Sequence, residues 1–401
     1  MAEPLALLHQ RAQENWLIGL DQIGLMELAD QRLQALQSLQ SKQSSDRPLT
    51  LFLSETEPTY FLASLIAACT LSNSHLFLCN PRWSHHEWQQ VKAIEVPDVV
   101  WGVGSGEWGV GSGEWQQERG RPKSKIQNPK SKILIPTGGS SGQVRFATHT
   151  WETLAASVNG FCAYFEVDRV HSCCMLPLYH VSGLMQFLRS FLTGGQFALP
   201  ERLADSSIDF QNFFLSLVPT QLHRLLQEPV ACDRLSQFHA VLLGGAPAWE
   251  ELLEQAKQRS IRLAPTYGMT ETASQVATLK PEDFLAGRSG VGRVLPHAQI
   301  QIQDGAGQAL DPGEIGIVAI QAASLPRDTT PIGLLIPGFR RMTWAILTRM
   351  ECCILLDGIA KKSLRGVKMS FPRKWNPPFA QLDWSKMFMC WACPMPIGEK
   401  W

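Results

Sequence analysis

Residues Lys132–His149 read KILIPTGGSSGQVRFATH, and five small residues, Gly138–Gly142, follow closely on the apolar run at its start. An apolar run bounded by glycine and serine predicts a strand that ends in a loop. Small residues let the backbone of that loop come close to a ligand. Its N–H groups, together with the hydroxyls of Thr137, Ser140 and Ser141, are donors that suit a polyphosphate. The stretch therefore predicts a phosphate-binding loop at the end of a strand.

This loop differs from a P-loop of the G-x-x-x-x-G-K-[ST] type, because no lysine followed by serine or threonine closes it. Arg145 stands just beyond the loop and can supply positive charge. A surface turn would use the same small residues, so on this stretch alone both interpretations stay open. The residues assigned to phosphate binding are Thr137, Gly138, Gly139, Ser140, Ser141, Gly142 and Arg145.

The sequence on both sides of the loop alternates between strand-like and helix-like runs. This alternation predicts parallel sheets covered by helices, an α/β fold. We expect Thr148 or Thr150 to cap the helix that follows the loop. Strands are expected at 49–55, 75–80, 173–178, 240–245 and 262–268, helices at 59–71, 84–94, 148–165, 183–195 and 248–260, and a strand–helix pair in 211–227.

The remaining regions have a different character. From about residue 290, short strands with turn residues at 298–310 and 313–321 predict a small antiparallel or barrel-like part. Residues 104–131 consist largely of seven-residue tandem repeats, based on WGVGSGE and PKSKIQN. Such low complexity cannot build a packed core, so we interpret 104–131 as an exposed inserted loop. The expected domains are 1–325 and a tail, 326–401.

A second motif, LLGGAPAWEE at Leu242–Glu251, is a strand that ends in a glycine pair before a helix. Ligands of open α/β sheets gather at the carboxyl ends of the strands. A flat aromatic base could lie against the backbone of Gly244, Gly245 and Ala246. A tight strand–helix turn also favours glycine, so a purely structural role is the alternative.

A third motif, PTYGMTETASQ at Pro265–Gln275, places several polar groups directly after a buried strand. Glu271 supplies a carboxylate, which Mg²⁺ binds together with phosphate oxygens. Thr270 and Thr272 supply hydroxyl donors for phosphate. The alternative interpretation is a capping stretch at the start of a helix.

Together, and in this order, the three motifs resemble those of the adenylate-forming superfamily of acyl-CoA synthetases. TGGSSGQVR resembles its phosphate-binding loop, GGAP its turn beside adenine, and YGMTE its nucleotide and metal motif. The resemblance covers residues 1–325 and implies the N-terminal domain of that fold, with layered α/β subdomains and a small β-barrel-like part. It implies nucleotide contacts from Tyr267, Gly268, Met269 and Thr270, catalytic roles for Thr270, Glu271 and His180, and Mg²⁺ at Glu271.

Within the superfamily, PLYHVSGLMQFLRSF (177–191) and TYGMTETASQVATL (266–279) are most similar to 2-succinylbenzoate–CoA ligases of menaquinone and phylloquinone biosynthesis. The resemblance implies a reaction with ATP, Mg²⁺ and coenzyme A. The substrate carboxylate attacks the α-phosphate of ATP and expels pyrophosphate, and the CoA thiol then displaces AMP. Activation is needed because a carboxylate is a poor acyl donor, and charged groups stabilise the transferring phosphorus.

Four residues are candidates for binding the acyl substrate. By the resemblance, His180 faces the acyl pocket, and a partly buried structural histidine is the alternative. Arg189 is a cation in an otherwise apolar helix. With Ser274 and Gln275 it is a candidate for gripping the second carboxylate of the substrate. A surface position for Arg189 is the alternative.

The overall composition argues against several other classes of protein. The formal net charge is zero, which gives no sign of a nucleic-acid partner. No apolar run reaches the roughly 18 residues of a transmembrane span, and no secretory signal is expected at the start. Ten cysteines, several of them in apolar surroundings, predict reduced core thiols and a cytoplasmic protein.

The superfamily's features beyond residue 325 are not visible in this sequence: an aspartate motif that binds ribose, a Gly-Arg hinge, and a small domain with a catalytic lysine. Five of the 13 tryptophans follow residue 340, and hydrophobic periodicity is lost. We interpret 326–401 as a misframed, non-native tail in place of that domain. In the frame that joins the last base of each codon to the first two of the next, Arg341–Ala345 can become Asp-Asp-Leu-Gly. In the same frame, Lys362–Trp375 can become Ile-Ile-Thr-Gly-Gly-Glu-Asn-Val-Phe-Pro-Ala-Glu-Val.

These observations favour a 2-succinylbenzoate–CoA ligase whose activity is impaired in this chain. Three alternatives stay open. The first is another aryl- or fatty-acyl-CoA ligase, the second is a catalytically dead nucleotide-binding remnant, and the third is a misfolded product that is rapidly degraded.

Overall fold

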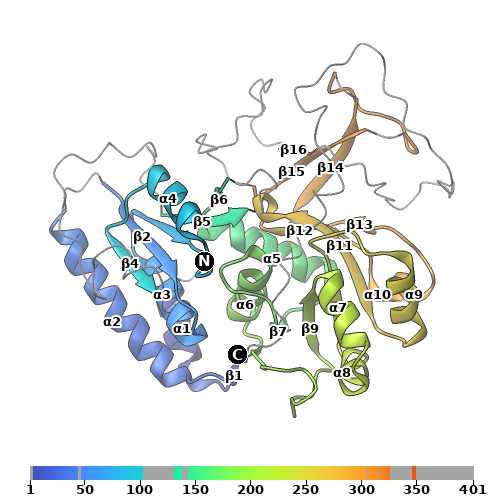
Figure 1. Ribbon diagram of the computed structural model, residues 1–401, viewed down its shortest axis with the longest axis horizontal. Coiled ribbons are helices and arrows are strands. Elements are labelled where there is room, and N and C mark those ends of the chain that lie inside the picture. Colours follow the sequence, from blue (N-terminus) through green and yellow to red (C-terminus); the bar gives the residue numbers. More distant parts are fainter. Residues whose placement is uncertain are drawn as a thin grey trace.

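The computed structural model describes residues 3–43, 47–102, 131–137, 143–304, 306–314, 316–325 and 346–348. Within these residues the chain forms two large, mainly parallel sheets, helices on their faces and a third, small antiparallel sheet. Figure 1 shows the first sheet in blue and cyan, the second in green and yellow, and the small sheet in orange. The α/β fold that the sequence predicts is therefore confirmed.

The first sheet has five strands in the order β4-β2-β3-β5-β6. All neighbouring strands are parallel except β5 and β6, which form an antiparallel hairpin. Every residue of β2 and β3 is buried, as expected for parallel strands covered on both faces. The strands are β2 (Leu49–Ser54), β3 (Ser74–Leu78), β4 (Val99–Gly102), β5 (Lys132–Thr137) and β6 (Arg145–His149).

Helices from the N-terminal part of the chain cover this sheet. α4 (His85–Ile94) packs on its outer face through Trp88 and Val91, and begins with a capping box between Ser84 and Glu87. The inner face is covered by α1 (Pro4–Gln10), α2 (Gln22–Ser41) and α3 (Pro58–Thr70), and the short 3-10 helix η1 (Arg11–Gln13) follows α1.

The second sheet has eight strands in the order β1-β8-β7-β9-β10-β11-β12-β13. The strands from β1 to β11 are parallel, and β12 and β13 are antiparallel additions at one edge. The strands are β1 (Leu17–Ile18), β7 (His171–Cys173), β8 (Phe197–Ala198), β9 (Phe213–Leu217), β10 (Ala240–Leu243), β11 (Leu263–Met269), β12 (Ser274–Thr278) and β13 (Arg293–Val294).

Two helices, α5 (Trp151–Phe165) and α6 (Val181–Thr193), lie between the two sheets (Figure 1). Leu154 and Val158 of α5 share a core cluster with the first sheet, and Phe161 shares another with β9 and β10 of the second. All residues from Gly183 to Phe191 of α6 are buried. Helices α7 (Pro219–Leu226), α8 (Pro229–Leu235) and α9 (Glu250–Gln258) cover the outer face of the second sheet, so the layers run αβαβα.

The small sheet consists of β14 (Ala298–Gln303), β15 (Ile317–Ala322) and β16 (Ile346–Thr348), all antiparallel. It follows α10 (Pro281–Leu285) and β13, where a small antiparallel part was predicted. β16 belongs to the predicted tail, 326–401, whose other residues lie outside the described ranges, as does most of the insert 104–131. The domain division therefore stays a prediction. Among the helices described, none combines the length and apolar character needed to span a bilayer.

The helices and strands predicted from the sequence correspond to elements of the structure, except for one strand. Thr150, rather than Thr148, caps α5, since its side chain accepts from the Thr153 N–H group. The strand predicted at 173–178 is wrong for most of its length, because β7 already ends at Cys173. Pro177 has no N–H group for a ladder, and its carbonyl instead accepts from the His180 N–H group in a turn.

His75 gives a prediction about stability and pH. This histidine of β3 is 0% exposed, and neither ring nitrogen has a hydrogen-bond partner among the described residues. Burial, and then the charge of Lys132, lower its pKa to about 4. Because the folded histidine is neutral and the unfolded one takes up a proton near pH 6.5, its contribution to stability is present above that pH. The contribution is lost as the pH falls towards 4.

We expect His75→Leu to make the free energy of unfolding less dependent on pH between 6.5 and 4. The slope should fall by up to about 1.4 kcal/mol per pH unit, the value for one proton. Urea unfolding at a series of pH values measures this slope. Parallel curves for the variant and the unchanged chain would contradict the prediction.

Candidate functional site

The ends of the glycine-serine loop belong to the hairpin of β5 and β6. Thr137, the last residue of β5, pairs with Arg145, the first residue of β6. Both are half-buried, and the Nε atom of Arg145 has no hydrogen-bond partner in the described part of the chain. The phosphate-binding role of the loop stays a prediction, because its other assigned residues lie outside the described ranges: Gly138, Gly139, Ser140, Ser141 and Gly142.

The threonine-glutamate motif lies against this hairpin. β11 ends at Met269, and the next residues form the short 3-10 helix η2 (Thr270–Thr272). The Nε2 atom of His149, the last residue of β6, lies 2.7 Å from the carbonyl oxygen of Thr270. His149 pairs with Ile133, at the end of the hairpin away from the loop, so the predicted metal motif neighbours the base of the hairpin that carries the predicted phosphate loop.

The glycine pair lies at the carboxyl end of β10, next to the strand that carries this motif. β10 and β11 are parallel, with Leu243 opposite Pro265. A Cβ atom at Gly244 would lie 2.6 Å from the Oγ1 atom of Thr266, and Gly245 has a φ of +80°, where glycine is favoured. Both glycines are thus needed for the turn itself, and the exposed backbone of Gly245 and Ala246 also leaves room for a flat base.

Glu271 has the surroundings expected of a metal ligand. Burial raises its pKa above the ordinary value, and none of the ion pairs between described residues involves it. A carboxylate in such a place gains from a hard cation that takes oxygen ligands. No group of three or more His, Cys, Asp or Glu side chains in the described residues could hold a metal ion, so the metal role of Glu271 stays a prediction.

The backbone around Glu271 is strained. Ala273 has a φ of 53° and Ser274 a φ of 98°, in the left-handed region that few residues other than glycine adopt. Gly268 opposes Ser274 so closely that a Cβ atom there would lie 2.1 Å from the Ser274 carbonyl oxygen. Tyr267 is buried in a core cluster shared with the small sheet. Strain of this kind is often found at ligand sites.

Arg189 of α6 is only 2% exposed, so the alternative of a surface position is wrong. Its Nη2 atom donates to the Ser274 hydroxyl at 3.0 Å and to Oε1 of Gln275 at 2.6 Å. The guanidinium also lies 4.3 Å from the ring centre of Phe161. The three predicted substrate residues Arg189, Ser274 and Gln275 are therefore in direct contact.

The charge of Arg189 is not neutralised by any carboxylate among the described residues. Its Nε atom and the Nε2 atom of Gln275 have no hydrogen-bond partner there, and burial lowers the arginine pKa to about 10. A buried cation is costly unless it is paired. This cluster is therefore suited to receive an anionic group.

His180 is the N-cap residue of α6, where the chain enters the layer between the sheets. Burial lowers its pKa to about 4, so the ring is neutral at pH 7. It packs on Tyr179, with ring centres 4.6 Å apart. These contacts suit both the predicted place beside an acyl pocket and a structural role, so the assignment stays a prediction.

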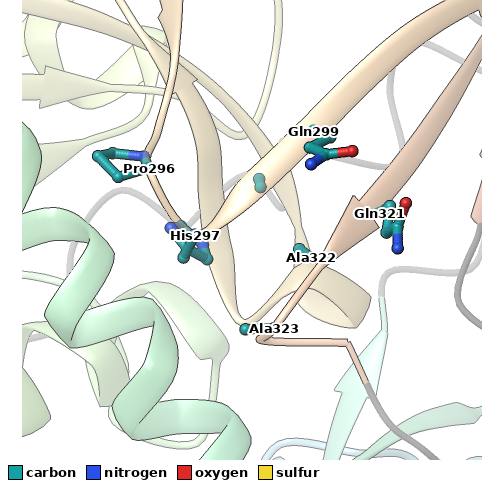
Figure 2. A pocket seen from close by; sticks show the side chains of 7 residues that line it. Pro296, His297, Gln299, Gln321, Ala322 and Ala323 are labelled. Carbon is teal, nitrogen blue, oxygen red and sulfur yellow. The ribbon is translucent and has the colours of Figure 1, made fainter.

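His149, described above, and His297 are not among the site residues predicted from the sequence. The ring of His297 lies over α5, where a Cβ atom at Gly160 would come within 1.9 Å of its Nδ1 atom. Burial and the charge of Arg189 lower its pKa to about 4. A glycine inside a regular helix is the signal that points to such a close neighbour. Figure 2 shows His297 at a pocket of about 350 Å³ that is also lined by Pro296, Ala298, Gln299, Gln321, Ala322 and Ala323.

Comparison with known families agrees with this arrangement. The sequence profile of the AMP-binding enzyme family matches residues 45–327, which include all three motifs and the strands that carry them. The chain belongs to this family. The match ends at the small sheet, so it covers most of the part that the structure describes.

Similar curated proteins are 2-succinylbenzoate–CoA ligases. That of Oceanobacillus iheyensis is 32% identical over 195 residues, or 46% of this chain and 39% of the relative. That of Bacillus subtilis is 30% identical over 202 residues, or 48% of this chain and 40% of the relative. The matching region thus spans about two fifths of these relatives' length.

Solved structures share the fold. The o-succinylbenzoate CoA synthetase of Bacillus subtilis, bound with a product analogue, has a TM-score of 0.66 at 23% identity and covers 80% of this chain and 69% of its own. The N-terminal domain of FACL13 from Mycobacterium tuberculosis has a TM-score of 0.64 at 18% identity, with 81% and 90% covered. The predicted fold class, an adenylate-forming N-terminal domain, is therefore confirmed.

Substitution of Arg189 separates a binding role from a structural one. We expect Arg189→Met to leave the free energy of unfolding unchanged or to raise it, because an apolar side chain removes the cost of burying an unpaired charge. Replacement of buried ion pairs by apolar residues is often neutral or gains about 1–4 kcal/mol. Urea unfolding at pH 7 measures the change, and a loss of about 3 kcal/mol or more would contradict the prediction.

Proposed function

We propose that the chain derives from an ATP-dependent 2-succinylbenzoate–CoA ligase, an AMP-forming acid–thiol ligase. One observation carries the proposal. The glycine pair after β10, the Tyr267–Glu271 motif and the base of the β5–β6 hairpin, which carries the glycine-serine loop, lie together at one edge of the second sheet. Ligands of open α/β sheets bind at such an edge, and the chain is a member of the AMP-binding enzyme family over this region.

The parts of the nucleotide are assigned to separate motifs. The adenine lies against Gly244, Gly245 and Ala246, and the loop between Thr137 and Arg145 binds the β- and γ-phosphates. Thr270 donates to phosphate, and Glu271 binds Mg²⁺. When bound, the metal ion offsets the negative charge of the phosphates as pyrophosphate leaves.

Arg189, Ser274 and Gln275 suggest which acyl substrate is used. A buried, unneutralised guanidinium suits a substrate with a second carboxylate besides the one that is activated. 2-Succinylbenzoate has this property, and the curated relatives named above carry this activity in their names. His180 is assigned to the wall of the same pocket. Menaquinone or phylloquinone biosynthesis in the cytoplasm is the corresponding biological role.

Another aryl- or acyl-CoA ligase remains the second candidate, because only the Arg189 cluster favours a dicarboxylate. ATP–pyrophosphate exchange with a panel of acids, measured on the chain whose C-terminal reading frame is restored as described below, distinguishes the two. We expect 2-succinylbenzoate to support faster exchange than benzoate or a fatty acid. Arg189→Met should reduce the advantage of 2-succinylbenzoate by about tenfold or more. Equal rates for all acids would contradict the substrate assignment.

Whether this chain catalyses the reaction depends on its tail, 326–401. We infer that the tail is a misframed reading of the C-terminal domain. Met and Trp each have a single codon, so some residues of the alternative frame are fixed. Met342-Thr343 must give Asp, and Trp344-Ala345 must give Gly. Between the two stretches described above, Leu356-Asp357-Gly358 can give Gly-Arg, the pair expected at the hinge. Three expected features then follow one another in a single frame, although codon choice is free at many positions.

Because this tail lacks the hinge and the lysine, we expect the chain to bind ATP but to catalyse adenylation very slowly. Sequencing the gene across codons 325–345 tests the frame, and a single-base change that restores it should give a ligase. Calorimetry and a coupled assay with ATP, Mg²⁺, CoA and 2-succinylbenzoate compare the two chains. An uninterrupted frame without any family-like alternative would reject the tail hypothesis. Absence of ATP binding in both chains would reject the ligase.

A further inference from the structure

The turn Met269–Ser274, which carries Thr270 and Glu271, is held by three buried side chains from distant parts of the sequence. They come from β6, from α5 and from the segment just after β15. The contacts are His149 Nε2 to the Thr270 carbonyl at 2.7 Å, Ser157 Oγ to the Ala273 carbonyl at 2.7 Å, and Ser324 Oγ to the Thr272 carbonyl at 2.8 Å.

The contact with His149 fixes the form of its ring. A carbonyl oxygen only accepts hydrogen bonds, so the Nε2 atom carries the hydrogen and donates it. The Nδ1 atom lies 3.2 Å from the Thr153 hydroxyl at the start of α5. His149 is 0% exposed, and burial lowers its pKa to about 4. The residue is therefore a neutral donor, held between α5 and the turn.

The three donors act on a backbone that needs support. Ala273 and Ser274 have positive φ angles, and such conformations persist only where the surrounding structure over-determines them. The carbonyl of Thr270 also accepts from the Ala273 N–H group at 3.0 Å. External donors to three of the turn's carbonyls thus stabilise the conformation that places Thr270 and Glu271 beside the β5–β6 hairpin.

We propose that His149, Ser157 and Ser324 are positioning residues, which hold the turn Met269–Ser274 in the geometry that binds Mg·ATP. The identity of the ligand rests on the proposed function, whereas the clamp on the turn rests only on the contacts above. Because His149 ends β6 and pairs with Ile133 at the base of the hairpin, it also connects the hairpin that carries the phosphate loop to the turn that carries Glu271. None of the three side chains is assigned a contact with the nucleotide.

Hydrogen exchange of the full chain, measured by mass spectrometry, tests the clamp without a ligand. His149→Phe keeps a ring but removes the donor, and Ser157→Ala and Ser324→Ala each remove one hydroxyl. We expect each variant to speed exchange about five- to tenfold in peptides that cover residues 269–278, the effect of losing one buried hydrogen bond. Peptides from α7 to α9 should keep their rates. His149→Gln, whose amide can donate to the same carbonyl, should restore slow exchange.

Calorimetry with Mg·ATP then tests the link to the nucleotide. We expect His149→Phe to weaken Mg·ATP binding about tenfold and His149→Gln to weaken it less than about threefold. AMP, which lacks the β- and γ-phosphates and is titrated without Mg²⁺, should be affected less. His75→Leu, a change at a buried histidine outside the site, is the matched control and should leave both affinities unchanged.

The outcomes separate the clamp from the ligase assignment. Unchanged exchange at 269–278 in all variants that fold would overturn the clamp, whatever the chain binds. Faster exchange over the whole protein would also overturn it, because the three residues would then be general parts of the fold. Locally faster exchange in a chain that binds neither ATP nor AMP would support the clamp and reject the proposed function.

Discussion

The helices α5 and α6 are covered by a sheet on each side, and the rest of the structure depends on this constraint. The buried polar side chains in this layer have no access to water, so each needs a partner within the protein. Ser157 donates to a turn of the second sheet, and Gln186 accepts from the Ser216 N–H group of β9. Arg189 finds only neutral partners among the described residues. A buried charge without a charged partner is a feature often found at binding sites.

The same layer explains how the candidate site is assembled. The hairpin of β5 and β6 comes from the first sheet, whereas the glycine pair and η2 belong to the second. α5 begins directly after β6, so the sheets are joined where the hairpin meets η2. The N-terminal region is fastened to the same layer, since buried Arg11 donates to the Ser190 and Gly195 carbonyls at the end of α6. Rigid elements on both sides therefore support a turn that is itself strained.

Membership of the AMP-binding family and the geometry of the site support the same function from different directions. The family profile says nothing about the acyl group, while the Arg189 cluster says nothing about the nucleotide. Together they are the basis for proposing a nucleotide-dependent enzyme that acts on an acid with two carboxylates. The matching region spans only part of the related ligases.

The sequence by itself determined the α/β alternation, many of the strands and helices, and the three motifs. These features depend on local periodicity, on glycine and on residue type, which can be read along the chain. The strand predicted at 173–178 was mostly wrong. Pro177 has no N–H group to donate to a strand ladder, and its carbonyl accepts in a turn instead. Only the tertiary structure decided that Arg189 is buried and that His149, Ser157, His297 and Ser324 lie at the site. Burial and contacts between distant segments depend on how the layers pack, and no local pattern encodes them.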